Sequence, residues 1–228
     1  MERGRQPSGH RRSPSHRGQP GLPRLEAVRL VHTPRWSQEI IIDNARFIGN
    51  VGWRQNHQSF DGGSVHFTGV KNLALGLTYI SRQRAINGSS WTMSTTHLDG
   101  SLNFQDIGTL RAYLLSIDYD QEAFWRSSTR TVGASFSGSA ELTDTLELTY
   151  RLELANQNDA GNNPLSVDAK YLRGDLGLLF GQVNLAVGYE VLGSGNNGSF
   201  TTPLATLHKF NGWTDKFLNT PGDGLTDA

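Results

Sequence analysis

The stretch T-L-E-L-T-Y-R-L-E-L, from Thr145 to Leu154, decides the fold. Leucine or tyrosine occupies every second position, and threonine, glutamate or arginine occupies the positions between them. Because successive side chains of a β-strand point to opposite faces, a strand here has one apolar face and one polar, charged face. The pattern fits a half-buried strand of a soluble sheet. It also fits a membrane strand with its leucines in lipid, which needs about ten residues.

Similar alternation recurs from Gln38 to Val191 and predicts a series of strands. Between residues 166 and 180 the apolar positions change parity, which predicts a β-bulge near Arg173-Gly174. Ten strands are expected, at residues 38–42, 46–54, 64–70, 73–80, 98–105, 110–119, 131–142, 145–154, 166–180 and 183–191.

The connections between these strands alternate in length. Tight turns are expected at 43–44, 71–72, 106–108, 143–144 and 181–182, and long loops at 55–63, 81–96, 120–128, 155–165 and beyond Gly193. Short turns at one rim and long loops at the other are typical of an outer-membrane barrel. The predicted fold class is therefore all-β, an antiparallel up-and-down meander that forms part of a transmembrane β-barrel. A soluble β-clam or calyx binding a small apolar ligand is the alternative, with its leucines turned inward.

The composition agrees with a strand-and-turn protein. The 228 residues include 26 Gly and no Cys, and 36% of them are hydrophobic. Without cysteine, disulfide frameworks and thiolate metal sites are excluded. No apolar run approaches the roughly 20 residues of a membrane helix, and no apolar signal-peptide core stands at the N-terminus. Entry into a membrane is therefore expected only as a barrel.

The first 36 residues differ from the rest of the chain. They contain eight Arg against two Glu, and their only apolar run is Leu25–Val31. Three interpretations remain open: an artefact of a wrong start or shifted reading frame, a disordered tail, or a basic arm that binds nucleic acid. The predicted division is a disordered, non-native head at 1–36, barrel strands at 37–193, and a long loop with a short helix at 194–228.

Two runs of sequence carry a resemblance to a known family. Q-E-I-I-I-D-N-A-R-F-I-G at residues 38–49, continuing to G-W-R-Q at 52–55, resembles a motif of bacterial outer-membrane channels of the alginate export family. T-P-L-A-T-L-H-K-F-N-G-W-T-D-K-F-L at residues 202–218 resembles a second motif of that family. In the family a Gly-Arg-Gln leads into the first run, whereas this chain has Trp36-Ser37-Gln38.

The resemblance implies a porin-like channel in the bacterial outer membrane that passes an anionic polysaccharide such as alginate, or a related organic anion. Its expected partners are outer-membrane lipid and that hydrophilic solute, with no nucleic acid and no cofactor. Because members of the family are longer, the chain is expected to be an internal fragment.

Candidate site residues follow from strand parity and from the second run. If the apolar stripes face lipid, the charged positions between them point into the lumen, either as a bracing network of ion pairs or as a selectivity lining. The helical spacing of Leu204, Leu207 and Phe210 after Thr202-Pro203 predicts a short helix that narrows the channel. The expected pore-lining residues are Arg46, Arg54, Glu147, Arg151, Glu153, Arg173, Asp175 and Glu190, and the expected constriction-loop residues are Pro203, His208, Phe210, Trp213 and Asp215.

Covalent chemistry is not expected. No nucleophile, base and orienting group can be assembled from the sequence, so an enzyme is not predicted. The four histidines after residue 36 lack metal-ligand spacing, and no metal site is predicted. The oxygen-rich segments at 159–163 and 193–198 fit turns better than calcium loops.

Overall fold

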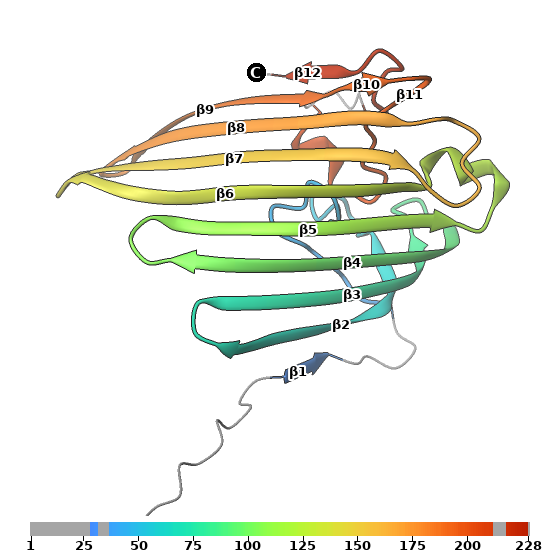
Figure 1. Ribbon diagram of the computed structural model, residues 1–228, viewed down its shortest axis with the longest axis horizontal. Coiled ribbons are helices and arrows are strands. Elements are labelled where there is room, and N and C mark those ends of the chain that lie inside the picture. Colours follow the sequence, from blue (N-terminus) through green and yellow to red (C-terminus); the bar gives the residue numbers. More distant parts are fainter. Residues whose placement is uncertain (1–27, 32–36, 212–217, 228) are drawn as a thin grey trace, which may run out of the picture.

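The structure is a computed structural model, which describes Val28–Val31, residues 37–211 and residues 218–227. Ten strands form one antiparallel sheet in the order β1-β2-β3-β4-β5-β6-β7-β8-β9-β12 (Figure 1). Two further strands, β10 and β11, pair separately. The bounds are β1 (Val28–Val31), β2 (Ser59–Val70), β3 (Leu73–Arg84), β4 (Ser90–Phe104), β5 (Gly108–Tyr119), β6 (Thr129–Thr143), β7 (Leu146–Asp159), β8 (Asp168–Phe180), β9 (Val183–Leu192), β10 (Ser194–Gly195), β11 (Gly198–Ser199) and β12 (Leu225–Asp227).

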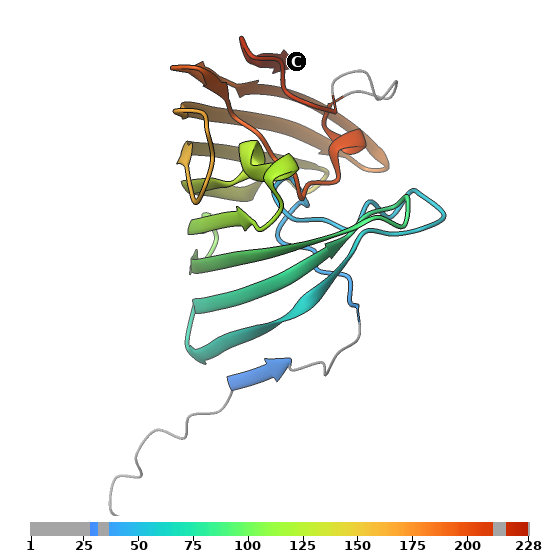
Figure 2. The same ribbon diagram turned by 90° about the vertical axis from the view of Figure 1, so that its right-hand side faces the viewer.

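The sheet is curved, and two segments fill its concave side. Figure 2 shows the strands bending around the loops that precede β2 and follow β11. We call residues 37–58 and 200–211 the first and second interior segments. They touch each other, since the amide of Gly49 donates to the carbonyl oxygen of Leu204 at 2.9 Å. The described part of the chain is therefore a curved section of barrel wall, and two segments of the same chain occupy its concave side.

The predicted asymmetry of the connections is confirmed. The turns β2–β3, β4–β5, β6–β7 and β8–β9 are tight and share one end of the sheet, while the longer connections share the other (Figure 1). Asn72, Asp106 and Gly181 take the positive φ values of 66°, 65° and 58° that such turns require. The long-loop end carries the 3-10 helix η1 (Glu122–Ser127), and the second interior segment carries η2 (Leu207–Lys209). Neither described helix is long and apolar enough to cross a membrane.

The outward face of the sheet is apolar over most of its width. In β7, Leu152 and Leu154 are more than half exposed, whereas Glu153 between them is buried on the concave side. This is the orientation of a membrane barrel and the opposite of a calyx, because a calyx would bury the leucines. The exposed outward side chains include Leu75, Leu77, Tyr79, Leu98, Leu102, Leu110, Val132, Leu152, Leu154, Leu172, Leu176, Leu178, Leu185, Val187 and Tyr189.

The concave face is apolar only toward the long-loop end. There the inward side chains of β3, β4 and β5, including Ile80, Met93 and Ile117, pack on Ile48 and Leu204 of the interior segments. A second cluster joins Tyr171 of β8 to Phe200. These inward contacts stabilise the interior segments by removing apolar surface from water.

The predicted β-bulge near Arg173-Gly174 is wrong. β8 pairs with β7 and with β9 without a register shift. The apolar positions change parity because Val167, Ala169 and Tyr171 face the interior cluster, while Leu176 and Leu178 face outward. One regularly paired strand thus has two different apolar environments.

Two of the ten predicted strands are also wrong, namely 38–42 and 46–54. This stretch forms the first interior segment, with isolated bridges from Ile48 to Ile42 and to Leu204. Its apolar residues alternate because Ile40 and Ile48 are buried against the strands, not because they face lipid. The other eight predicted strands correspond to β2–β9.

Seven of the eight confirmed strands are longer than expected, and β8 is two residues shorter. The predicted loop 81–96 consists largely of the ends of β3 and β4, which leave only Ala85–Ser89 between them. The pattern is less regular here because a strand that extends beyond the lipid has no requirement for an apolar outer face.

The sheet edges differ from the expectation in one respect. Val28–Val31, inside the head predicted to be disordered, pairs with residues 64–67 of β2. An open β2 edge presents unpaired backbone groups, and this short strand pairs with four of the twelve β2 residues. At the other edge β12 pairs with β9, and within the described residues β1 and β12 do not pair with each other.

Candidate functional site

A line of charged side chains crosses the concave face near the middle of the sheet. The register places Arg111 of β5, Ser135 of β6, Glu153 of β7, Arg173 of β8 and Glu190 of β9 side by side. Arg151 pairs with Asp175 in the adjacent line. We call the charged residues of these two lines the charged row: Arg111, Arg151, Glu153, Arg173, Asp175 and Glu190.

In the middle of the charged row, Glu153 is almost completely buried, with 1% of its surface exposed. Its carboxylate accepts hydrogen bonds from Arg151 at 2.7 and 3.2 Å and from the hydroxyl of Tyr113 at 2.8 Å. A buried carboxylate needs such partners, because an unpaired charge is costly away from water. Arg151 and Tyr113 supply them from the same strand and from β5.

Toward β9 the charged row continues through Arg173. Its guanidinium donates to Asp175 at 2.7 and 3.1 Å and lies 3.7 Å from Glu190. Glu190 accepts a hydrogen bond from the hydroxyl of Tyr171 at 2.6 Å. Toward β4, Arg111 donates to Asp99 at 3.1 Å, and the buried His97 lies 3.5 Å from the same carboxylate.

The first interior segment is joined to this row by Arg46, which is fully buried. Its Nε donates to Glu190 at 2.8 Å and one terminal nitrogen donates to the hydroxyl of Thr202 at 3.0 Å. The other terminal nitrogen has no hydrogen-bond partner in the described structure, and the guanidinium lies 5.0 Å from the centre of the Phe210 ring. Arg46 thus connects both interior segments to β9.

Asp43 makes a second connection between the first interior segment and the wall. Its carboxylate accepts hydrogen bonds from both terminal nitrogens of Arg151 and lies 3.5 Å from Arg111. Burial by itself raises the pKa of Asp43, but the hydrogen bonds and charge of Arg151 and the charge of Arg111 outweigh it, and the net pKa is lowered. The carboxylate is therefore ionised at neutral pH.

The structure brings most of the expected pore-lining residues together. Arg46, Arg151, Glu153, Arg173, Asp175 and Glu190 belong to the contacts above, although Arg46 lies in an interior segment and not in a strand. Arg54 is exposed in the loop before β2, where its guanidinium lies 3.9 Å from the Trp53 ring. Glu147 is half-buried at the tight-turn end, opposite Glu141 of β6, and so outside the charged row.

The predicted helix over the second interior segment is reduced to η2, three residues with Thr206 and not Thr202 before it. Thr202 instead uses its hydroxyl to accept from Arg46. Phe210 is buried, and the ring of His208 stacks on Trp53 with centroids 3.8 Å apart. Pro203 lines the pockets beside this segment. Trp213 and Asp215 lie outside the described residues.

Sequence reasoning missed Arg111, Asp99 and Asp43. Arg111 shares its parity with Tyr113 and Leu115, an apolar stripe that faces inward in the structure. If that stripe is assigned to the lipid-facing side, Arg111 is excluded from the predicted pore lining. Thr109, Arg111 and Tyr113 alternate with Leu110, Ala112 and Leu114, and this polar–apolar alternation is the signal that would have found it.

The oxygen-rich segments serve as turns. Asp159 accepts from the amide of Val167 at 2.9 Å, and Asn163 accepts from the amide of Leu165 at 2.9 Å. In the described ranges no group of three or more His, Asp or Glu side chains is placed to hold a metal ion. The arginines and carboxylates of the charged row pair with one another. Together they form a charged surface that can hydrogen-bond to a polar solute.

An antiparallel meander with apolar convex and charged concave faces, tight turns at one end and interior segments within the curve has the architecture of an outer-membrane β-barrel wall. Solved structures with this fold are outer-membrane porins. OccAB2 of Acinetobacter baumannii aligns over 82% of this chain and 49% of its own, with a TM-score of 0.58 and 16% identity.

Two further porins give the same result. OpdL of Pseudomonas aeruginosa aligns over 74% of this chain and 48% of its own, with a TM-score of 0.59 and 14% identity. OccAB3 of A. baumannii aligns over 66% of this chain and 40% of its own, with a TM-score of 0.56 and 19% identity. The chain thus spans less than half the length of these porins, and the likeness concerns the fold. No family model and no curated protein matches the sequence.

Proposed function

We propose that the chain forms part of the wall and interior of a bacterial outer-membrane channel that passes a hydrophilic, anionic organic solute. The observation that carries the proposal is the reversal of polarity across the sheet. Leu152 and Leu154 are exposed on the convex face, and Glu153 between them is held by Arg151 on the concave face. A lipid-facing exterior and a charged lumen are what a passive channel needs.

Selectivity for anions is proposed from the arginines of the charged row. Arg111, Arg151 and Arg173 present guanidinium groups whose side chains keep 15–19% of their surface exposed. Guanidinium binds carboxylates with two parallel hydrogen bonds, which suits recognition of organic acids. Each arginine already has a carboxylate partner. A solute must displace that carboxylate from the arginine, and this competition keeps binding weak enough for release.

The alginate export resemblance supplies the proposed solute class, a uronate polymer or a related organic anion. The two runs that carry the resemblance, residues 38–55 and 202–218, coincide largely with the interior segments. Because Arg46 joins these segments to Glu190 and Thr202, we propose that they narrow the passage. Pro203, His208 and Phe210 belong to this proposed constriction, and Trp213 and Asp215 keep the role expected from the sequence.

Ion selectivity in planar bilayers tests the proposal. The full chain, inserted from detergent, should give a reversal potential that favours chloride over potassium in a KCl gradient. Arg151→Gln and Arg173→Gln should each shift that potential toward cation selectivity, while Arg54→Gln, outside the charged row, should leave it unchanged. Conductance without anion preference would refute the selectivity, and failure of the chain to insert into lipid vesicles would refute its placement in a channel wall.

A further inference from the structure

An uncharged pocket lies at the long-loop end, apart from the charged row. Its volume is about 240 Å³. The lining contains no Asp, Glu, Lys, Arg or His. It includes Trp91, Tyr119, Phe124, Ser127, Thr201 and Asn219.

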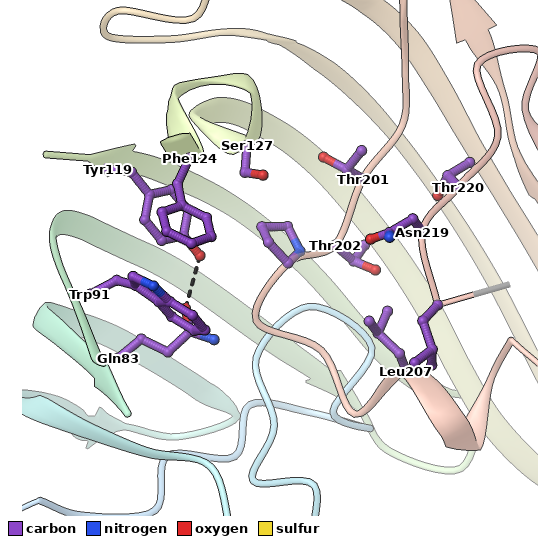
Figure 3. Close-up of a pocket in the computed structure, with 12 residues that line it drawn as sticks. Gln83, Trp91, Tyr119, Phe124, Ser127, Thr201, Thr202, Leu207, Asn219 and Thr220 are labelled. Atoms are coloured by element: carbon purple, nitrogen blue, oxygen red, sulfur yellow. Dashed lines mark hydrogen bonds between the residues drawn. The ribbon is translucent and has the colours of Figure 1, made fainter. Parts of the chain in front are cut away.

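The two sides of this pocket differ in chemistry. Figure 3 shows the rings of Trp91, Tyr119 and Phe124 on one side and the side chains of Thr201, Thr202 and Leu207 on the other. Phe124 of η1 packs between the two other rings, with centroid distances of 4.8 Å to Trp91 and 5.7 Å to Tyr119. The hydroxyl of Tyr119 donates a hydrogen bond to Oε1 of Gln83 at 2.9 Å, which fixes the orientation of the Tyr119 ring. The aromatic side is thus a preformed surface.

The polar side is also held in place. Gln157 of β7 clamps the backbone of Thr201, donating to its carbonyl oxygen at 2.9 Å and accepting from its amide at 2.8 Å. Thr202 is fixed by the hydrogen bond from Arg46. The hydroxyl of Thr201 is buried and has no hydrogen-bond partner in the described structure, and in Figure 3 it is turned toward Ser127.

From these contacts we infer that the pocket between η1 and the second interior segment binds one uncharged sugar ring. A pyranose has an apolar C–H face, which suits the aromatic side, and a rim of hydroxyls that donate and accept, which suits Thr201, Ser127 and Asn219. The volume is below the roughly 300–1,000 Å³ of pockets for drug-sized molecules, so one ring fits and a chain does not.

The lining argues against the other ligand classes. A carboxylate would lose water without gaining a cation, because no basic side chain lines the pocket. A wholly apolar ring would remove the polar side chains of Ser127 and Asn219 from water without replacing their hydrogen bonds, which costs binding free energy. The neutral site therefore complements the charged row and shares no residue with it.

Ligand-observed NMR on the full chain folded in detergent micelles tests this inference, with methyl β-glucopyranoside as the probe. Saturable binding with a Kd on the order of millimolar is expected. Methyl glucuronide, the charged analogue, and cyclohexanol, the ring without a hydroxyl rim, should each bind at least tenfold more weakly.

Two substitutions locate the binding site. Thr201→Val keeps the side-chain shape and removes the hydroxyl, and Phe124→Leu removes the central ring; each should raise Kd roughly 3- to 10-fold. Thr145→Val and Phe104→Leu make the same chemical changes at the tight-turn end and should leave Kd unchanged.

Three results would overturn the inference: no saturable binding by folded protein, tighter binding of the glucuronide than of the neutral glycoside, or equal Kd values for the wild type and both pocket variants. Far-UV circular dichroism of each variant confirms the fold. Because the assay measures binding and not conductance, its outcome is independent of whether the chain conducts ions.

Discussion

The guanidinium of Arg46 shows what one residue contributes to this molecule. It is fully buried, and its partners Glu190 and Thr202 are 144 and 156 residues away in the sequence. Removing one member of a buried ion pair leaves the other charge unpaired in a poorly solvated site. Arg46 therefore fixes the position of both interior segments relative to β9.

We expect Arg46→Met to lower the free energy of unfolding by about 3–5 kcal/mol, because Glu190 would remain buried without its main partner. Urea titration of vesicle-folded protein measures the change. Arg54→Met, at an exposed position where the guanidinium stacks on Trp53, should cost at most about 1 kcal/mol. Equal effects of the two substitutions would show that the Arg46 contact does not stabilise the fold.

Asp43 gives a pH-dependent prediction at the same scale. Its pKa is lowered from the ordinary 3.8, so the folded state binds fewer protons than the unfolded state in this range. The stabilisation is complete above pH 3.8 and is lost as the pH falls through the lowered pKa.

Limited proteolysis with an acid-active protease should reveal the protonation of Asp43. Cleavage within residues 37–58 should become faster at low pH. Asp43→Asn should cleave quickly at every pH, since the amide cannot replace the ionic contact with Arg151 and Arg111. Asp144→Asn, in an exposed turn, is the matched control. A low-pH step that persists in Asp43→Asn would assign the titration to another group.

At the scale of the element, the strands carry two kinds of apolar surface. β7 exposes Leu152 and Leu154 outward along its length, whereas β5 buries Leu115 and Ile117 inward against the interior segments. Strand alternation reports that one face is apolar but not what covers it. In the structure the outward face of β7 is exposed, whereas the inward face of β5 is covered by another part of the same chain.

The outward assignment is tested by Leu152→Arg, which should reduce folding stability in lipid by about 2–4 kcal/mol if the residue lies near the bilayer midplane. Leu142→Arg, close to the tight-turn rim, should cost about 0–1 kcal/mol, because the charge there reaches water. Urea midpoints in vesicles give both values. An unchanged midpoint for Leu152→Arg would rule out a lipid-facing position.

At the scale of the whole molecule, the sheet is open in the described residues, with β1 and β12 at its two edges. Each edge strand is short, four residues in β1 and three in β12. Backbone groups at an open edge have no partner in lipid, so both edges need neighbours to be stable there.

Hydrogen exchange of the detergent-folded chain should follow this architecture. Backbone amides of β5, β6 and β7 should exchange slowest, because each of these strands is paired along most of its length on both sides. Amides of β12 and β1 should exchange fastest. Mass spectrometry of peptic fragments makes the comparison, and equal protection across the sheet would indicate that the edges are paired with each other or with a second copy.

The sequence by itself determined the meander. Period-two alternation and the turn residues near Asn72, Asp106 and Gly181 are local signals, because side-chain direction and backbone φ depend on neighbouring residues only. They predicted ten strands, of which eight are confirmed, together with the tight-turn rim and the inward direction of Arg151, Glu153 and Arg173.

Only the tertiary structure decided which apolar faces meet lipid and which meet protein. Residues 38–54 alternate like strands but fold inside the curve, because Ile48 and Phe47 find apolar partners on β5, β8 and Leu204. The ion pairs Arg46–Glu190 and Asp43–Arg151 join residues more than a hundred positions apart. Such pairs follow from the curvature of the whole sheet, which brings distant segments together, and no local pattern encodes them.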